Sequence, residues 1–247
     1  MVLPMSIGDA AQEGDRDTVI AWLDAGGSIN DIDEVGSSLV YCCTQADVEE
    51  HTIGDGHVAL ARHLIALGAD VNAAPDDGFT PLHEICQKHR EPQAVLDMMS
   101  LLLGAGANVN ARDISGDTPL SHALWHTPRY SLRMVTELLR AGASLDVCHG
   151  DHAPSKTAED VMQRRDSYSS YLAGNEHWIE IKALVAGVRQ HGSYKRYARS
   201  FHRDVLAVRG LAQRGKLSTD DSVLNFLARL GDNGVVWHVL EYWRATN

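Results

Sequence analysis

One five-residue phrase occurs four times within the first 146 residues of the chain. It reads Gly-Gly-Ser-Ile-Asn from residue 26, Gly-Ala-Asp-Val-Asn from 68, Gly-Ala-Asn-Val-Asn from 106 and Gly-Ala-Ser-Leu-Asp from 142. Successive copies are 42, 38 and 36 residues apart. A period of this size predicts stacked repeats, each of which contacts only its neighbours. Such a stack presents an extended surface, which favours a binding function over a function that needs an enclosed pocket.

The third unit shows what each repeat contains. Thr80 is a predicted helix N-cap, and Pro81 suits the first helical position, where its missing N–H is not needed. A short helix is expected to run to about His89, and a second, over 95–103, is apolar almost all round and needs neighbours on several sides. Gly106 can end that second helix in the left-handed C-cap conformation. The fourth unit opens with Thr-Pro-Leu from residue 118, and its second helix is expected over 132–140.

These residues resemble the ankyrin repeat, whose pattern is a turn with Gly-x-Thr-Pro-Leu-His, two helices and Gly-Ala-Asp-Val-Asn. The match is specific in the third and fourth units, degenerate in the first and second, and hinted at again over 156–161 and 178–187. The resemblance covers residues 5–188 and implies an all-α solenoid of helix-turn-helix repeats with β-hairpin-like turns. It also implies that His83 bridges backbone groups of its own turn and of the neighbouring repeat.

Extra residues lengthen the turns between the two helices of several repeats. They fall at 47–55, 90–94, 127–129 and 166–175, all on one edge of the predicted stack. Insertions in loops cost little entropy per added residue, so these segments are either tolerated loop growth or an edge that contacts a partner.

The pattern ends near residue 190, which predicts a repeat domain over 1–190 and a C-terminal helical segment over 191–247. That segment is expected to cap the open end of the stack. Alternatively, residues 233–243 resemble the short helical box of F-box-like or SOCS-box ubiquitin-ligase adaptors, although they lack the Leu-Pro that usually precedes it. Residues 189–216 carry eight basic side chains against Asp204 alone, which fits a solvated helix face, pairing with the acidic repeats or a second partner.

Charge and cysteine content restrict the classes of partner and compartment. Residues 1–174 contain 11 basic and 26 acidic residues, so the repeats should repel nucleic acid and anionic membranes. No apolar run approaches the ~18 residues of a membrane span, and the five residues before the first repeat leave no room for a signal peptide. The four cysteines form no metal-binding or disulfide framework. We therefore expect an intracellular protein, cytoplasmic or nuclear, with no cofactor and no metal.

A search for catalytic patterns predicts no enzyme. His122 and His126 are four apart on a helix, but no glutamate lies between them to complete a zinc-protease motif. The cluster at 148–152, which holds Cys148, lies in a connecting turn where a tetrahedral ligand set is hard to assemble. The sequence contains no Gly-rich phosphate loop and no Gly-x-Ser-x-Gly elbow.

The resemblance places partner recognition on a concave face, made by the first helix of each repeat and the turn before it. Aligning the repeats puts Trp125 on that face, either as an exposed aromatic anchor or packed against its own turn or the next repeat. The candidate partner-binding residues are Glu84, Gln87, Lys88, Arg112, Asp113, Ile114, His122, Trp125 and His126. The predicted function is a non-catalytic protein-interaction module or scaffold. The alternatives are a ubiquitin-ligase substrate adaptor and a subunit that stabilises a larger assembly.

Overall fold

A computed structural model describes residues 2–45, 53–88, 93–125, 128–146, 157–169, 172 and 174–200, with the backbone alone for 128–131. These residues form ten α-helices and a further helical stretch over 194–200. The ten helices are α1 (Met5–Gln12), α2 (Arg16–Asp24), α3 (Leu39–Gln45), α4 (Asp55–Ala66), α5 (Pro81–Cys86), α6 (Gln93–Gly104), α7 (Pro119–Trp125), α8 (Pro128–Arg140), α9 (Ala158–Tyr168) and α10 (Glu176–His191).

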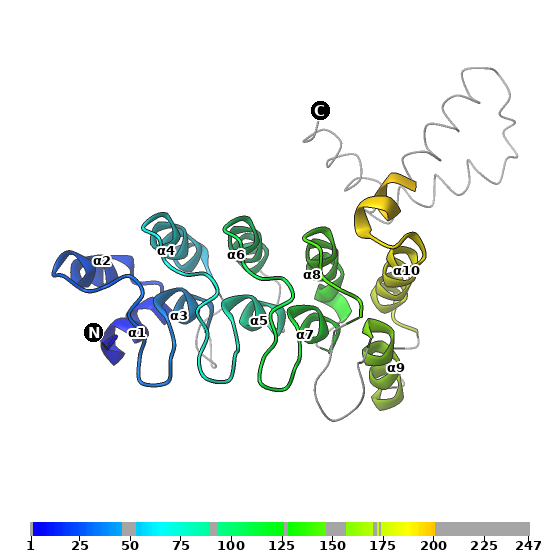
Figure 1. Ribbon diagram of the computed structural model, residues 1–247, viewed down its shortest axis with the longest axis horizontal. Helices are drawn as coiled ribbons and strands as arrows, with labels where there is room; N and C mark the ends of the chain where they lie inside the picture. Colours follow the sequence, from blue (N-terminus) through cyan, green and yellow to red (C-terminus); the bar gives the residue numbers. More distant parts are fainter. Residues whose placement is uncertain are drawn as a thin grey trace, which may run out of the picture. The chain divides into compact units, whose positions relative to one another are not determined.

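The helices of the first compact unit, Met1–Ala186, form two layers (Figure 1). The first helix of each repeat packs against the next in the order α1, α3, α5, α7 and α9, and α4, α6 and α8 form the outer layer. The core lies between the layers and consists of side chains with no exposure, such as Leu64, Met98, Leu102, Leu120 and Leu124. The predicted all-α repeat fold is confirmed. In the described part of the chain, β-pairing is confined to single bridges of Ile32 with Val2 and Ser38.

The helix boundaries differ slightly from the sequence predictions. Helix α5 ends at Cys86 and not near residue 89, and α8 begins at Pro128 and not at 132. The predicted cap is present, since the Thr80 hydroxyl accepts the His83 N–H and Pro81 occupies the first helical position. Capping is set by neighbours in the chain, which explains why it can be read from sequence.

The first glycine of each phrase closes a helix. Gly26, Gly68, Gly106 and Gly142 all have positive φ, between 91° and 102°. In the third repeat the Gly106 N–H donates to the Leu103 carbonyl at 3.2 Å and the following N–H donates to the Leu102 carbonyl at 3.0 Å. This is the paired pattern of a Schellman C-cap, and the other three copies repeat it. A residue with a Cβ would be strained at these positions, so the glycines recur.

The asparagine that ends the phrase joins neighbouring repeats. The Asn72 side-chain oxygen accepts the Asn108 N–H at 2.7 Å, and its amide donates to the Gly106 carbonyl at 3.3 Å. Asn110 makes the same two bonds one repeat further on, to the Ser144 N–H and the Gly142 carbonyl. Each phrase is therefore hydrogen-bonded to the next copy, which fixes the spacing between repeats.

The second compact unit comprises Gly187–Asn247, of which residues 187–200 are described. The Tyr197 ring packs directly on Gly187, where any Cβ would collide with it, and lies 5.8 Å from the His191 ring. The predicted helix from residue 194 is seen as far as 200, and the later tail helices and the 233–243 box lie outside the described residues. The division after residue 190 and the role of the tail stay predictions.

Candidate protein-binding surface

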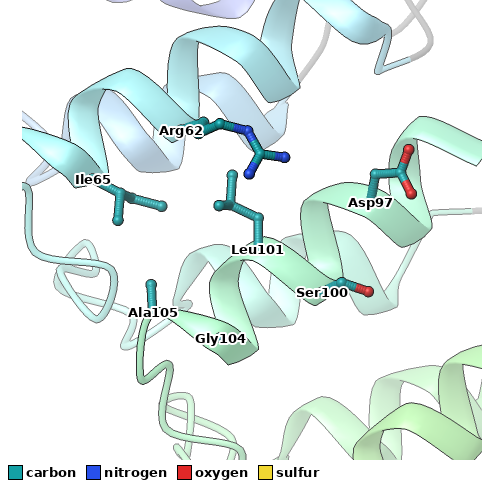
Figure 2. Close-up of a pocket in the computed structure, with 7 residues that line it drawn as sticks. All are labelled: Arg62, Ile65, Asp97, Ser100, Leu101, Gly104 and Ala105. Carbon is teal, nitrogen blue, oxygen red and sulfur yellow. The ribbon is translucent and has the colours of Figure 1, made fainter. Parts of the chain in front are cut away.

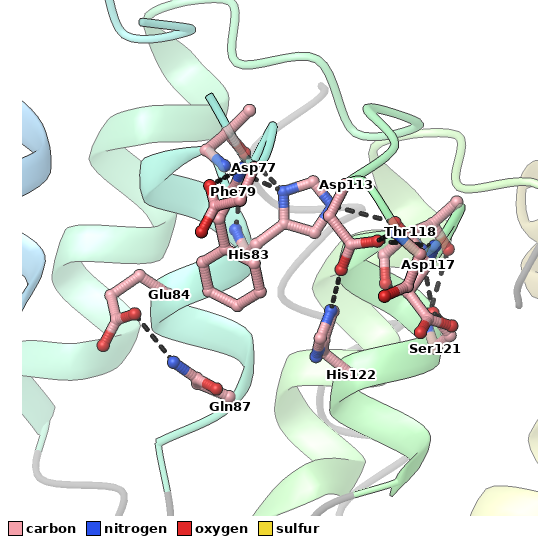
Figure 3. Close-up of polar contacts among 12 residues, drawn as sticks. Asp77, Phe79, His83, Glu84, Gln87, Asp113, Asp117, Thr118, Ser121 and His122 are labelled. Atoms are coloured by element: carbon pink, nitrogen blue, oxygen red, sulfur yellow. Dashed lines mark hydrogen bonds and ion pairs between the residues drawn. The ribbon is translucent and has the colours of Figure 1, made fainter. Parts of the chain in front are cut away.

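The predicted binding residues that the structure describes lie on what we call the inner-helix face: the C-terminal ends of α1, α3, α5 and α7 with the turns that precede α3, α5 and α7. Three of them form one polar network at the end of α5. Lys88 Nζ lies 2.6 Å from the Glu84 carboxylate. The Gln87 amide donates to the same carboxylate at 2.7 Å (Figure 3). Glu84 is only 7% exposed, so these two donors satisfy a largely buried charge.

This network continues into the preceding repeats. Lys88 Nζ also donates to the Gln45 carbonyl at 3.1 Å, and the Gln12 amide donates to the Gln45 side-chain oxygen at 2.8 Å. The inner-helix face therefore carries a hydrogen-bonded polar ladder from α1 to α5. A partner gains little from polar groups that already have partners, because each new bond replaces an existing one.

The junction between the third and fourth repeats is held by His83. Its Nδ1 accepts the Thr80 N–H at 3.1 Å, so Nε2 carries the proton and donates to the Asp117 carbonyl at 3.1 Å (Figure 3). The predicted bridge to the neighbouring repeat is confirmed. Burial, followed by the neighbouring His122, lowers the pKa of His83 to about 4. The imidazole is therefore neutral at pH 7, as this bonding pattern requires.

The turn before α7 is tied to that helix by Asp113. Its carboxylate accepts the N–H groups of Ser115 and Asp117 at 2.8 and 2.9 Å, and lies 2.9 Å from His122 Nε2. Asp113 and His122 therefore support the turn (Figure 3). At its tip, Arg112 is exposed and Ile114 is 75% exposed.

Within the described residues, the group that could hold a metal ion consists of Asp113, Asp117 and His122, whose donor atoms lie within 4.8 Å of one another. Those atoms have partners within the fold: besides the bonds of Asp113, the Asp117 carboxylate accepts the Ser121 hydroxyl at 3.1 Å. This geometry fits a structural turn as well as it fits a metal site, so it does not by itself indicate a metal.

Trp125 ends α7 and is 38% exposed. Its ring meets the Tyr168 ring edge-on, with centroids 6.0 Å apart, and the Arg164 guanidinium lies 5.7 Å from the Trp125 ring centroid. Both neighbours come from α9, so the next repeat covers part of the ring and leaves part of it open. The two alternatives left by the sequence are each realised in part. His126 lies outside the described residues.

Sequence reasoning did not select Tyr168 or Arg164 for this site. The available signal was the insertion at 166–175, which contains Tyr168, together with an arginine four residues before that tyrosine in the sequence. The neighbouring Arg165 anchors α9: it donates to the Leu124 carbonyl and lies 5.0 Å from the Trp178 ring. Burial lowers the pKa of Arg165 to about 10, which leaves it cationic at neutral pH.

The described cysteines are poor nucleophiles. Cys42, Cys43 and Cys86 are buried, and burial raises the pKa of each thiol, that of Cys42 to about 12. A thiol must ionise to attack or to bind a metal, so these three act as small apolar side chains. Cys148 and its cluster at 148–152 lie outside the described residues.

An open groove of about 500 Å³ lies on the outer layer, between α4 and α6 (Figure 2). Ile65, Leu101 and Ala105 give it an apolar part, while Arg62 and Asp97 put opposite charges at its edge. This mixed lining does not favour one kind of ligand. In the part of the chain that the structure describes, no helix is both long enough and apolar enough to cross a membrane.

Comparisons with known proteins agree with the repeat architecture. Residues 51–148 match the family model "Ankyrin repeats (3 copies)". The chain is 30% identical to the ankyrin repeat domain-containing protein M-T5 of Myxoma virus over 60% of its own length and 27% of that protein. It is 37% identical to stress-activated protein kinase alpha of Dictyostelium discoideum (33% of this chain, 12% of that protein) and 38% identical to human ankyrin repeat and SOCS box protein 16 (39% and 19%). The chain thus spans less than a third of each of these relatives.

Proposed function

We propose, from the premise that this chain carries ankyrin repeats, that it is a non-catalytic module that binds a protein partner through its inner-helix face. Ankyrin repeats imply protein–protein interaction. The observation that carries the proposal is Trp125, a large aromatic side chain that remains 38% exposed at the end of α7. Partly exposed tryptophan is costly to leave in water and is enriched at the energetic centres of interfaces.

The rest of the inner-helix face supports this assignment. Ile114 projects from the turn before α7 and is 75% exposed, which adds apolar surface to the same repeat as Trp125. The polar ladder of Gln12, Gln45 and Lys88 is already bonded within the fold. We therefore expect affinity to come from the fourth repeat, with the ladder as complementary surface.

Affinity capture tests the proposal. The full chain, a variant with Ile114→Ser and Trp125→Ala, and an outer-layer control with Leu67→Ser are used as baits in lysates of cells that express the protein. Leu67 is 53% exposed at the end of α4, so its substitution matches the loss of apolar surface. At least one protein should be recovered by the full chain and the control and lost from the double variant. Identical recovery by all three baits would rule out binding through this face.

A second candidate is a ubiquitin-ligase substrate adaptor whose C-terminal segment recruits the ligase. It is supported by the identity to a relative whose name includes a SOCS box and by the sequence of residues 233–243. Capture with the full chain and with a chain truncated after Gly192 separates the two functions. Ligase subunits recovered only with the full chain would favour the adaptor, while their absence from both would leave the interaction module alone.

A further inference from the structure

Four exposed apolar side chains lie near the start of α1, at the end of the row of inner helices where the N-terminus is found (Figure 1). They are Val2, Met5, Ile32 and Val35, and we call them the N-terminal apolar patch. Their exposed fractions are 62%, 81%, 47% and 65%. Val2 and Ile32 are β-bridge partners, so their side chains lie next to each other and form one apolar surface.

The Val2 segment is the open edge of this part of the stack. The turn before α3 packs on the next turn, where a Cβ on Gly36 would lie 3.0 Å from the Pro75 Cα, and it bonds to the Val2 segment through the Leu3 N–H and the Ile32 carbonyl. Peptide groups alternate in direction along a strand, so the Val2 N–H and C=O point away from that turn. Within the described residues neither group has a hydrogen-bond partner. An open strand edge favours the addition of an extended segment from another protein.

The charge around the patch is strongly negative. Residues 1–80 carry 15 acidic and 2 basic side chains, whereas residues 81–174 carry 11 acidic and 9 basic ones. The two basic side chains are Arg16 on α2 and Arg62 on α4, so α1, α3 and the turns before α3 and α5 contain no lysine or arginine. The excess negative charge of the repeats is therefore concentrated at the end of the stack that carries the patch.

Carboxylates lie beside the apolar side chains. Glu34 is exposed in the turn before α3, and Asp9 is exposed on α1, one helical turn after Met5. Burial, followed by Asp33 and Asp9, raises the pKa of the Cys42 thiol to about 12, so both carboxylates lie near the same residue of α3. Among the described residues, no cation forms an ion pair with Asp9, Asp33 or Glu34. These carboxylates are available to a cationic partner.

We propose that the N-terminal apolar patch binds an extended protein segment that carries Lys or Arg next to apolar side chains. The apolar side chains cover Val2 and Ile32, and the cations pair with Glu34 and Asp9. A second copy of this chain would bring the same excess of carboxylates to the patch, which disfavours self-association there. The phosphates of nucleic acids and anionic membranes are repelled for the same reason.

Peptide selection tests the inference. Random twelve-residue peptides displayed on phage are depleted on a Val2→Ser/Val35→Ser variant and then selected on the unchanged full chain, so that the retained peptides depend on the patch. Enriched sequences should combine Leu, Ile, Val or Phe with neighbouring Lys or Arg. Their Kd, measured by fluorescence anisotropy, should rise at least about fivefold with Ile32→Ser and with Glu34→Lys, and it should rise with salt.

Asp24→Lys is the matched control for Glu34→Lys, because Asp24 is an exposed carboxylate at the end of α2 and the charge change is the same. It should leave the Kd within about twofold. Circular dichroism of each variant confirms folding. Enrichment of acidic peptides, enrichment of apolar peptides without Lys or Arg, no enrichment at all, or equal losses for the two charge variants would each overturn the inference.

Light scattering tests the other occupant, a second copy of the chain. A dimer that is lost in the Val2→Ser/Val35→Ser variant would assign the patch to self-association and overturn the inference. The proposed function is tested separately, because Ile114 and Trp125 belong to the fourth repeat and remain unchanged in all of these variants. Loss of partner capture in the Ile114→Ser and Trp125→Ala variant therefore stands whether or not the patch binds a basic segment.

Discussion

Helices α5 and α7 open with almost the same residues, Thr-Pro-Leu-His and Thr-Pro-Leu-Ser, and differ in how they meet the next repeat. In α5, His83 crosses to the Asp117 carbonyl of the fourth repeat. In α7, Ser121 is too short to cross, and its hydroxyl bonds to the Thr118 carbonyl and the Asp117 carboxylate close by. Helix α5 is therefore hydrogen-bonded to the next repeat through His83. The equivalent residue of α7, Ser121, bonds to residues of its own repeat.

The C-terminal ends of the two helices differ as well. The end of α5 is polar and internally bonded, through Glu84, Gln87 and Lys88. The end of α7 is Trp125, which meets the next repeat through Tyr168 and Arg164 and stays partly open. Satisfied polar groups stabilise a fold and add little to binding, whereas a partly exposed aromatic ring gains from being covered. The comparison supports the proposal that α5 serves mainly stability and that α7 serves mainly recognition.

Lowering the pH should reduce the free energy of unfolding through His83 of α5, and this is the largest effect that we predict. The pKa of His83 is lowered to about 4 in the folded protein because the ring is buried, against an ordinary value near 6.5. At a pH between these two pKa values, His83 is protonated in the unfolded chain and neutral in the folded protein. The stability that His83 contributes is therefore complete above about pH 6.5 and is lost as the pH falls toward 4, by up to about 3 kcal/mol.

Urea unfolding of the full chain and of His83→Gln at several pH values between 7.5 and 4 measures this effect. The glutamine cannot titrate, so the free energy of unfolding should fall less steeply with acid in the variant. His63→Gln is the matched control, since it also replaces a histidine, here one that is only partly buried on α4. If the free energy of unfolding fell equally with pH in His83→Gln and in the unchanged protein, the prediction that His83 titrates at a lowered pKa would be wrong.

Trp125→Ala should give the next largest effect, on binding. We expect the affinity for the captured partner to fall by about 2 kcal/mol, or roughly thirtyfold, because truncation removes the partly exposed ring that packs against Tyr168. The free energy of unfolding should fall as well, by about 2 kcal/mol, since the buried part of the ring contacts α9. Isothermal titration calorimetry and urea unfolding separate these two quantities. A large loss of stability with unchanged affinity would make Trp125 a packing residue and reverse the comparison.

Most of the capping and bridging contacts of α5 could be predicted from the sequence, but few of the contacts around Trp125 at the end of α7 could. The Thr80 cap, the His83 bridge and the C-cap at Gly106 depend on residues a few positions apart or on a recurring motif, so the pattern reveals them. Trp125 could be placed at the surface by alignment for the same reason. Its neighbours Tyr168 and Arg164 could not, because they lie about 40 residues away in a degenerate repeat. Only the packing of α9 on α7 decides which side chains reach the ring.

The polar ladder illustrates the same limit. Gln12, Gln45 and Gln87 align in one column, so the sequence places them on one face. Whether such side chains bond to each other or remain available to a partner depends on rotamers and on the spacing between repeats. The Gln12–Gln45 bond and the Lys88 bond to the Gln45 carbonyl are therefore structural findings.

Ser121→Ala should have a smaller effect, on the stability of α7. The Ser121 hydroxyl accepts the Thr118 N–H at 2.8 Å, and both residues are buried. Removing it leaves that N–H without this acceptor, which should reduce the free energy of unfolding by about 1 kcal/mol. Ser100→Ala on α6 is the control, because Ser100 is exposed and should change stability by less than about 0.3 kcal/mol. Equal effects at the two positions would contradict a structural role for the Ser121 hydroxyl.

The smallest effect is expected for Gln87→Ala. Gln87 directly follows α5 and aligns with Trp125, the last residue of α7. The Gln87 amide already donates to the Glu84 carboxylate, and a partner that bonds to it must first break that interaction. Partner affinity should therefore change less than about threefold, or about 0.6 kcal/mol, in the calorimetric titration used for Trp125→Ala. A loss of affinity of tenfold or more would place the end of α5 at the energetic centre of the interface. Recognition would then extend across both repeats instead of depending mainly on Trp125 and its neighbours from α9.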